Sequence, residues 1–156
     1  MTFEEWKEYK MTHKSTFDFE GVKKAFAAIK NQCFDGKLQD VKFWWMPPAW
    51  EEKEPELQGL YLVDEKAVYI KMSLFDDRDY SNVFMSCIFH ELAHAFCAEE
   101  GIKDTDGKKH LEAFADVCRA HGGECYWNDE KHGYNDARLK RETLYSIYEE
   151  MERSGV

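Results

Sequence analysis

The stretch CIFHELAHAF, residues 87–96, places two histidines four positions apart, with a glutamate directly after the first. Residues four apart lie on one face of an α-helix, about one turn from each other. His90 and His94 could therefore bind one small cation together, at the ~2.0–2.1 Å of zinc–imidazole bonds. Glu91 would then lie beside that cation, where a carboxylate can accept a proton from bound water. These three residues predict a metal site with a base next to it.

A helix must hold these side chains. The residues from Asp79 to Gly101 predict one, because Ser81 or Asn82 can cap its start and glycine is favoured just after a helix end. The helix is apolar almost throughout and contains neither lysine nor arginine, so we expect it to be central. In so apolar a setting a carboxylate and two imidazoles are costly to bury without partners. A partly buried polar stripe is the alternative interpretation of the motif.

A catalytic zinc usually has three protein ligands and one position for water. Two candidates for the third ligand follow the motif: His110, sixteen positions after His94, and Glu112, eighteen after it. A polar turn over 103–108 would let the chain return antiparallel into a second helix, predicted from His110 to Ala120. Its position beside that turn favours His110, and Glu112 stays the alternative.

The remaining elements predict an α+β fold in one domain spanning residues 1–156, with a small antiparallel-rich sheet packed on helices. The expected elements are a helix over Phe19–Phe34, a strand over Val41–Met46, a solvated loop over Ala49–Gln58, a hairpin of Gly59–Val63 with Ala67–Met72, and a C-terminal helix over about 135–153.

Composition excludes some classes of function. The formal net charge of −10, from 21 basic and 31 acidic residues, disfavours direct nucleic-acid binding. No apolar run approaches the ~18 residues of a membrane span, and the acidic start does not resemble a secretion leader. Five cysteines without a CxxC pair argue against a disulfide framework and a four-cysteine zinc ribbon. We therefore expect reduced thiols and a cytoplasmic location, in the host cytoplasm if the protein is phage-encoded.

Several short motifs occur in an order and spacing that resembles the SprT-like metallopeptidase domain, which includes bacterial SprT proteins and the protease domain of Spartan. They are FDGKL at 34–38, GLY at 59–61, YIKMSLF at 69–75, HELAHAF at 90–96 and HLEAF at 110–114. The resemblance covers about residues 20–120. HELAH with the downstream H-x-x-x-F is its most specific part.

The resemblance implies a zincin-like (gluzincin) core and a zinc-dependent peptidase acting on protein or peptide substrates. In this family pattern His90, His94 and His110 hold Zn²⁺, and Glu91 assists the attack of a zinc-bound water on the peptide bond. The chain departs from the pattern in lacking the zinc ribbon that often follows the domain. Its negative charge also does not suit the DNA-guided targeting attributed to Spartan.

Three alternatives remain open from the sequence. The residues Glu112 and Asp116 resemble the motif of ImmA-like gluzincins, in which a glutamate binds the metal and an aspartate four positions later orients a histidine. By that pattern Glu112 would be the third ligand. A zinc-stabilised, non-catalytic protein-binding adaptor is the second, and a metal-free interaction module the third. Under the peptidase interpretation, an apolar wall of Trp44, Trp45 and Trp50 could hold an extended peptide against a strand edge, although we expect at least one of them to pack in the core.

Overall fold

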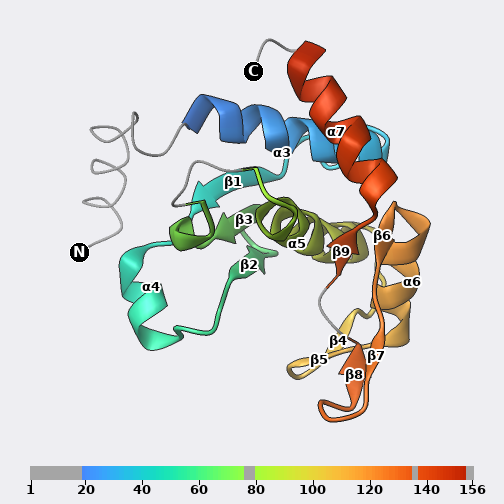
Figure 1. The fold of residues 1–156 in the computed structure, drawn as a ribbon. Coiled ribbons are helices and arrows are strands. Elements are labelled where there is room, and N and C mark those ends of the chain that lie inside the picture. Colours follow the sequence, from blue (N-terminus) through green and yellow to red (C-terminus); the bar gives the residue numbers. More distant parts are fainter. Residues whose placement is uncertain (1–18, 76–79, 135–136, 154–156) are drawn as a thin grey trace.

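The computed structural model describes residues 19–75, 80–134 and 137–153. The described part has α+β architecture, with five α-helices and several small sheets (Figure 1). The helices are α3 (Phe19–Phe34), α4 (Pro48–Lys53), α5 (Asn82–Glu100), α6 (Glu112–Ala120) and α7 (Arg141–Arg153), with a short 3₁₀ helix η1 (Met72–Phe75). The strands are β1 (Lys42–Trp45), β2 (Gly59–Leu62), β3 (Ala67–Ile70), β4 (Thr105–Asp106), β5 (Lys109–His110), β6 (Gly123–Glu124), β7 (Trp127–Asn128), β8 (Gly133–Tyr134) and β9 (Arg138–Leu139).

The largest sheet has three strands in the order β1-β3-β2. The hairpin predicted from the sequence is present, since β2 and β3 pair antiparallel with Gly59 opposite Ile70. The sheet is nevertheless mixed, because β1 pairs with β3 in parallel, with Lys42 opposite Ala67. The expectation of an antiparallel-rich sheet is thus correct for one of its two strand pairs.

The helix that carries the HELAH motif runs through the middle of the molecule (Figure 1). Ser81 is its N-cap, as one of the two expected residues, and its side chain accepts a hydrogen bond from the Phe84 N–H at 3.3 Å. Gly101 ends the helix with a positive φ of 68°, which glycine adopts without steric cost. Eleven of the nineteen residues of α5 are buried, which confirms the prediction that this helix is central.

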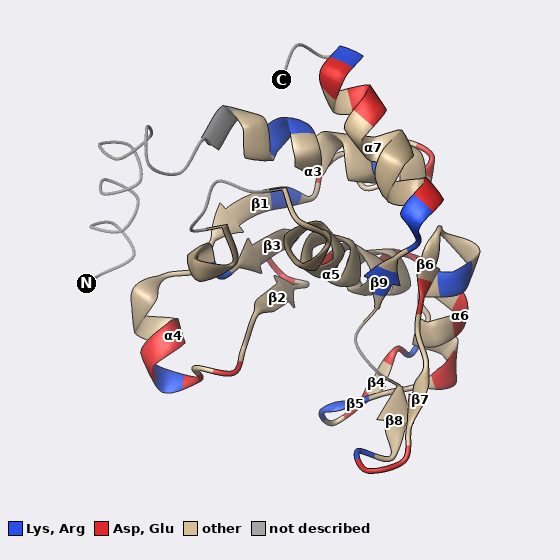
Figure 2. Cartoon of the chain, in the orientation of Figure 1, with Lys and Arg blue, Asp and Glu red and all other residues tan. Residues whose placement is uncertain are grey.

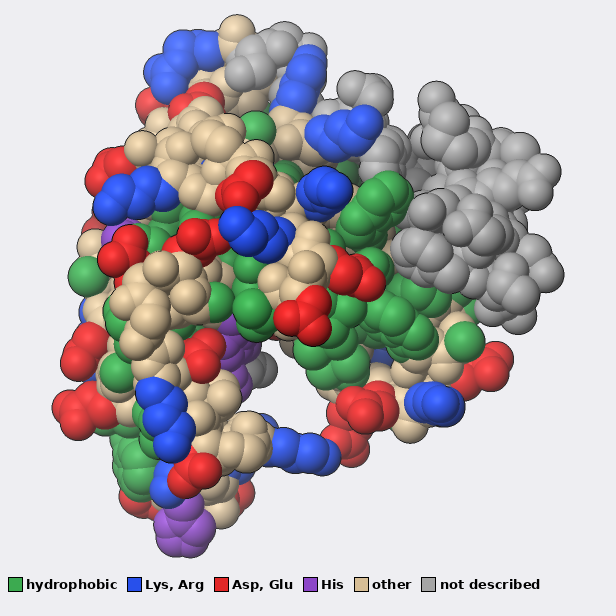
Figure 3. Space-filling view, turned by 180° about the vertical axis from the view of Figure 1, so that it is seen from behind, with side chains coloured by type: hydrophobic (Ala, Val, Ile, Leu, Met, Phe, Trp, Pro, Cys, Tyr) green, Lys and Arg blue, Asp and Glu red, His purple; other side chains and the backbone are tan. Residues whose placement is uncertain are grey.

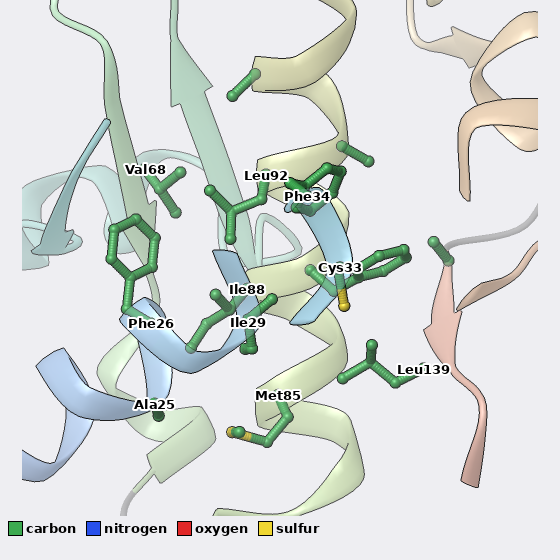
Figure 4. Packing of buried hydrophobic residues seen from close by; sticks show 14 of the residues in the cluster. Ala25, Phe26, Ile29, Cys33, Phe34, Val68, Met85, Ile88, Leu92 and Leu139 are labelled. Atoms are coloured by element: carbon green, nitrogen blue, oxygen red, sulfur yellow. The ribbon is translucent and has the colours of Figure 1, made fainter. Parts of the chain in front are cut away.

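The core lies where α3 and α5 pack against one face of the three-stranded sheet (Figure 4). Phe26 of α3 contacts Phe43 of β1, with ring centroids 5.5 Å apart, and Ile88 and Leu92 of α5 fill the space between helix and sheet. Burying large apolar side chains is the main favourable term in folding, about 1.5–3 kcal/mol for each. This packing fixes α5 and with it the side chains of the HELAH motif.

Three predicted boundaries were wrong, each because a tertiary or strand-pairing contact overrides the local pattern. The expected loop over 49–58 begins with the short helix α4, where Pro48 occupies the first helical turn and the Trp50 ring packs on Tyr69 at 4.8 Å. The helix expected from His110 begins at Glu112, because His110 pairs with Thr105 in a hairpin.

The C-terminal helix begins at Arg141 instead of near residue 135. Residues 135 and 136 lie outside the described part of the chain. The next residues form β9, which pairs with β6, and the Leu139 N–H donates to Oγ of Ser86 on α5 at 2.9 Å. These bonds hold the backbone extended up to the start of α7.

The short strands β4, β5, β7 and β8 build two hairpins that form a lobe beside α6 (Figure 1). Gly133 of β8 lies against Lys109 and His110 of β5, since a Cβ placed there would meet the Lys109 side chain at 3.0 Å and the His110 carbonyl oxygen at 3.5 Å. The two hairpins are therefore in contact where His110 leaves the strand.

All five cysteines lie within the described residues and are free thiols, as expected. Acidic residues are prominent on α4 and on the segment after it (Figure 2). None of the helices in the described ranges combines the length and apolar character that a bilayer crossing requires.

Candidate metal centre

The three predicted histidine ligands converge. Nε2 of His94 lies 3.1 Å from Nε2 of His90 and 3.2 Å from Nε2 of His110, and one ligand atom from each of the three lies within 4.8 Å of the others. Tetrahedral ligands with zinc–nitrogen bonds of 2.0–2.1 Å lie about 3.3–3.4 Å apart, close to these separations. The histidines can therefore bind one metal ion.

His110 reaches the cluster through the hairpin of β4 and β5. Gly107 forms the turn with a φ of 65°, and the Leu111 N–H donates to the Asp104 carbonyl at 2.9 Å just beyond the paired strands. The ring of Phe114, on α6, stacks on His94 at 4.4 Å and on His110 at 4.8 Å. The hairpin thus brings His110 back to α5, and Phe114 forms an apolar floor under both rings.

Asp104 orients His94. Its Oδ2 lies 2.7 Å from Nδ1 of His94, and this hydrogen bond holds the pKa of Asp104 below its usual value. An ionised Asp104 accepts a hydrogen bond, so Nδ1 of His94 carries a proton at this contact and Nε2 is the ring nitrogen left for a metal. A carboxylate in this position is typical of metal-binding histidines.

His90 is the most buried of the three ligands, at 8 % exposure. Burial lowers its pKa well below the usual value, and the neighbouring His94 and His110 lower it further. The ring is therefore neutral at neutral pH, the form that binds metals. Its Nδ1 accepts a hydrogen bond from the Ala137 N–H at 3.3 Å, so binding a metal through Nε2 requires the ring proton to move and this bond to be given up.

Glu91, the predicted base, is buried beside the histidines at 6 % exposure. Its Oε2 lies 3.8 Å from Nε2 of His90. The carboxylate also lies against Gly59 at the start of β2, since a Cβ placed on that glycine would come within 3.1 Å of Oε2. Glu91 is therefore held next to the point where the imidazoles meet, as the motif predicts.

The structure separates the two candidates for the third ligand. His110 belongs to the cluster, whereas Glu112 is exposed on the first turn of α6 and is not part of it. Asp116, the expected partner of a histidine in the alternative arrangement, is also exposed and faces Arg119, with Oδ1 3.4 Å from Nη1. The carboxylate that contacts a histidine is instead that of Asp104. The sequence pattern predicted the polar turn over 103–108 but gave no sign that Asp104 within it has this role.

The aromatic wall does not form as expected. Trp45 is fully buried in the core and packs against Phe84, whereas Trp44 and Trp50 join the small apolar cluster around Tyr69. Since side chains alternate along a strand, this cluster lies on the sheet face opposite α5. Trp44 and Trp50 therefore do not border the histidines.

The histidine cluster opens toward the surface. Figure 3 shows a hollow between the lobe of β4, β5, β7 and β8 and the segment of α4, with a histidine side chain on its wall. His94 and His110 are half-buried. Part of the cluster is therefore accessible from the surface.

Comparisons of this chain with models of protein families, with curated proteins and with solved structures gave no match. The resemblance to the SprT-like domain therefore stays a prediction from the motifs.

Proposed function

We propose that this chain is a zinc-dependent peptidase in which His90, His94 and His110 bind the metal and Glu91 is the general base. The observation that carries the proposal is the convergence of three imidazole Nε2 atoms with a buried carboxylate at their side. A site that only stabilised the fold would have no use for that carboxylate.

The donor set fits zinc. Three imidazoles are the ligands of many catalytic zinc sites, and one further coordination position then remains for water or substrate. Within the described ranges the cluster supplies three ligand atoms and no fourth. A closed structural site usually has four protein ligands, so this count favours a catalytic site over a zinc-stabilised adaptor.

When bound, zinc would lower the pKa of water from ~15.7 to about 7 and polarise the substrate carbonyl. The residues of the chain supply the rest. Glu91 accepts the proton at a carboxylate oxygen and returns it to the leaving amine. Asp104 keeps the proton of His94 on Nδ1 so that Nε2 faces the metal. Phe114 excludes water from one side of the two histidine rings.

The substrate in this proposal is an extended polypeptide lying in the hollow of Figure 3. Among the described strands β2 pairs only with β3, so its second edge is available for backbone hydrogen bonds, and Gly59 at its start lies against Glu91. The five free thiols suit a reducing compartment, so we place the protein in the cytoplasm.

The experiment compares zinc content and cleavage of unfolded, fluorophore-labelled casein for the wild type, Glu91→Gln and His94→Ala, purified identically. Glu91→Gln should keep its zinc and lose nearly all turnover, because glutamine cannot accept the proton. His94→Ala should lose both. Equal cleavage by wild type and Glu91→Gln would count against the mechanism, and zinc binding without cleavage by any of them would favour the adaptor.

A further inference from the structure

The glycine at the start of β2 leaves the space that Glu91 occupies. A Cβ placed on Gly59 would lie 3.1 Å from both Cγ and Oε2 of Glu91, and 3.0 Å from Sγ of Cys87. Cβ contacts between 3.0 and 3.4 Å are tighter than nine in ten of those found in proteins, so a neighbour must move. Gly59 is not among the glycines with a positive φ, so the missing side chain matters here and not an unusual backbone conformation.

In the wild-type surroundings, neither the backbone of β2 nor that of α5 can easily move away from such a contact. Gly59 pairs with Ile70 in the sheet, and the Lys71 N–H donates to the Gln58 carbonyl at 2.9 Å directly before it. On the other side, α5 is fixed by fully buried residues such as Ile88 and Leu92. The side chains of Glu91 and Cys87 are therefore the parts that would give way.

We propose that Gly59 is a positioning residue for Glu91, and that with Cys87 in place a side chain at position 59 displaces the carboxylate from the candidate metal centre. The inference rests on the proposed function. The atoms that a Cβ at position 59 would meet belong to side chains and not to the backbone, so we expect the strand to keep its place while the Glu91 side chain shifts. The reaction should be more sensitive than the fold, since a misplacement of the carboxylate by about 1 Å can cost about 100-fold in rate.

Cys87 supplies a test of this geometry, because its thiol forms the other wall of the same space. Removing that thiol with Cys87→Ala opens space on the side away from Glu91, into which the start of β2 can shift by the few tenths of an ångström that the contact requires. The double variant Gly59→Ala/Cys87→Ala should therefore restore the position of Glu91. A rescue of this kind would not follow if Gly59→Ala acted by weakening the strand.

The experiment measures three quantities for the wild type, Gly59→Ala, Cys87→Ala, the double variant and Glu91→Gln. They are zinc affinity by competition with a coloured chelator, acetohydroxamate affinity of the zinc-loaded protein by calorimetry, and kcat and KM for labelled casein. A hydroxamate chelates the metal, and a carboxylate beside the metal strengthens its binding through a hydrogen bond, so its affinity reports where Glu91 lies even if casein is not cleaved.

Gly59→Ala should keep the zinc affinity of the wild type, lose hydroxamate affinity as Glu91→Gln does, and lose about 100-fold in kcat with KM unchanged. The double variant should recover most of both losses. Wild-type hydroxamate affinity in Gly59→Ala, an equal loss of zinc, or no recovery in the double variant would overturn the inference.

If Gly59→Ala folds poorly, Cys87→Met crowds Glu91 from the helix side and must give the same selective loss. A wild type that binds zinc and hydroxamate but cleaves nothing overturns the peptidase proposal alone. In that case the acetohydroxamate affinities of the wild type, Gly59→Ala and the double variant still test the role of Gly59. A wild type that binds no zinc overturns both.

Discussion

Removing the carboxylate of Asp104 should weaken zinc binding. Its hydrogen bond with Nδ1 of His94 is short, at 2.7 Å, and charge-assisted bonds contribute about 1.5–3 kcal/mol. The Asp104 side chain is 26 % exposed, so water screens part of this interaction and the lower half of that range applies. We expect Asp104→Ala to bind zinc about tenfold more weakly, the low end of the 10–100-fold typical of such partners.

Asp104→Asn should lose less than Asp104→Ala, because the amide oxygen can still accept the hydrogen bond but carries no charge. Asp106→Asn is the matched control, since Asp106 is an exposed residue of the same hairpin and the change in net charge is identical. Competition against a coloured chelator at pH 7 gives the affinities. Equal zinc affinity in Asp104→Ala and Asp106→Asn would refute the reasoning.

Two further predictions test the packing around the site. Gly123→Ala should destabilise the protein by about 1–3 kcal/mol in urea unfolding, because overpacking forces buried groups apart and the new Cβ would lie 2.4 Å from Cε1 of Phe89. Combining it with Phe89→Leu should cost less than the sum of the two single changes, and an additive result would contradict the contact. Iodoacetamide at pH 8 should label half-buried Cys87 before Cys33 and Cys97, whose pKa values burial raises to about 12, and equal labelling by mass spectrometry would contradict this burial.

Sequence patterns predict an element well where local signals agree with burial. The helical period of α3 gave a correct element because its apolar residues also face the core, and Ser81 and Gly101 marked the two ends of α5. The spacing of His90 and His94 then required both rings to share one face of α5. The convergence of the two α5 histidines of the candidate metal centre could thus be predicted before the fold was known.

Features that depend on pairing between distant segments could not be predicted in this way. Alternation along β1 indicates which side chains face the core but does not specify its neighbour, so its parallel pairing with β3 was missed. The pattern after His110 is helical, yet the hairpin to Thr105 keeps this histidine extended. Asp104 contacts His94 only because the same hairpin folds back on α5, and nothing in its local sequence distinguishes it from Asp106.

The position of His110 has a consequence for folding. Two of the candidate ligands, His90 and His94, lie on α5, and the third, His110, lies on β5. A bound metal would therefore join the lobe of β4, β5, β7 and β8 to the core. Binding to the folded state alone stabilises it, by about 2.7 kcal/mol when the metal is at 100 times its dissociation constant. Removing the metal should therefore affect this lobe first.

The most direct test of the account is the zinc stoichiometry and affinity of the wild type, His110→Ala and Glu112→Gln, measured side by side on metal-stripped protein. The wild type should bind one zinc ion per chain, His110→Ala should not retain it, and Glu112→Gln should match the wild type, because only the histidine belongs to the cluster. A wild type that binds no zinc, or a pair of variants with the opposite result, would contradict the metal centre described above.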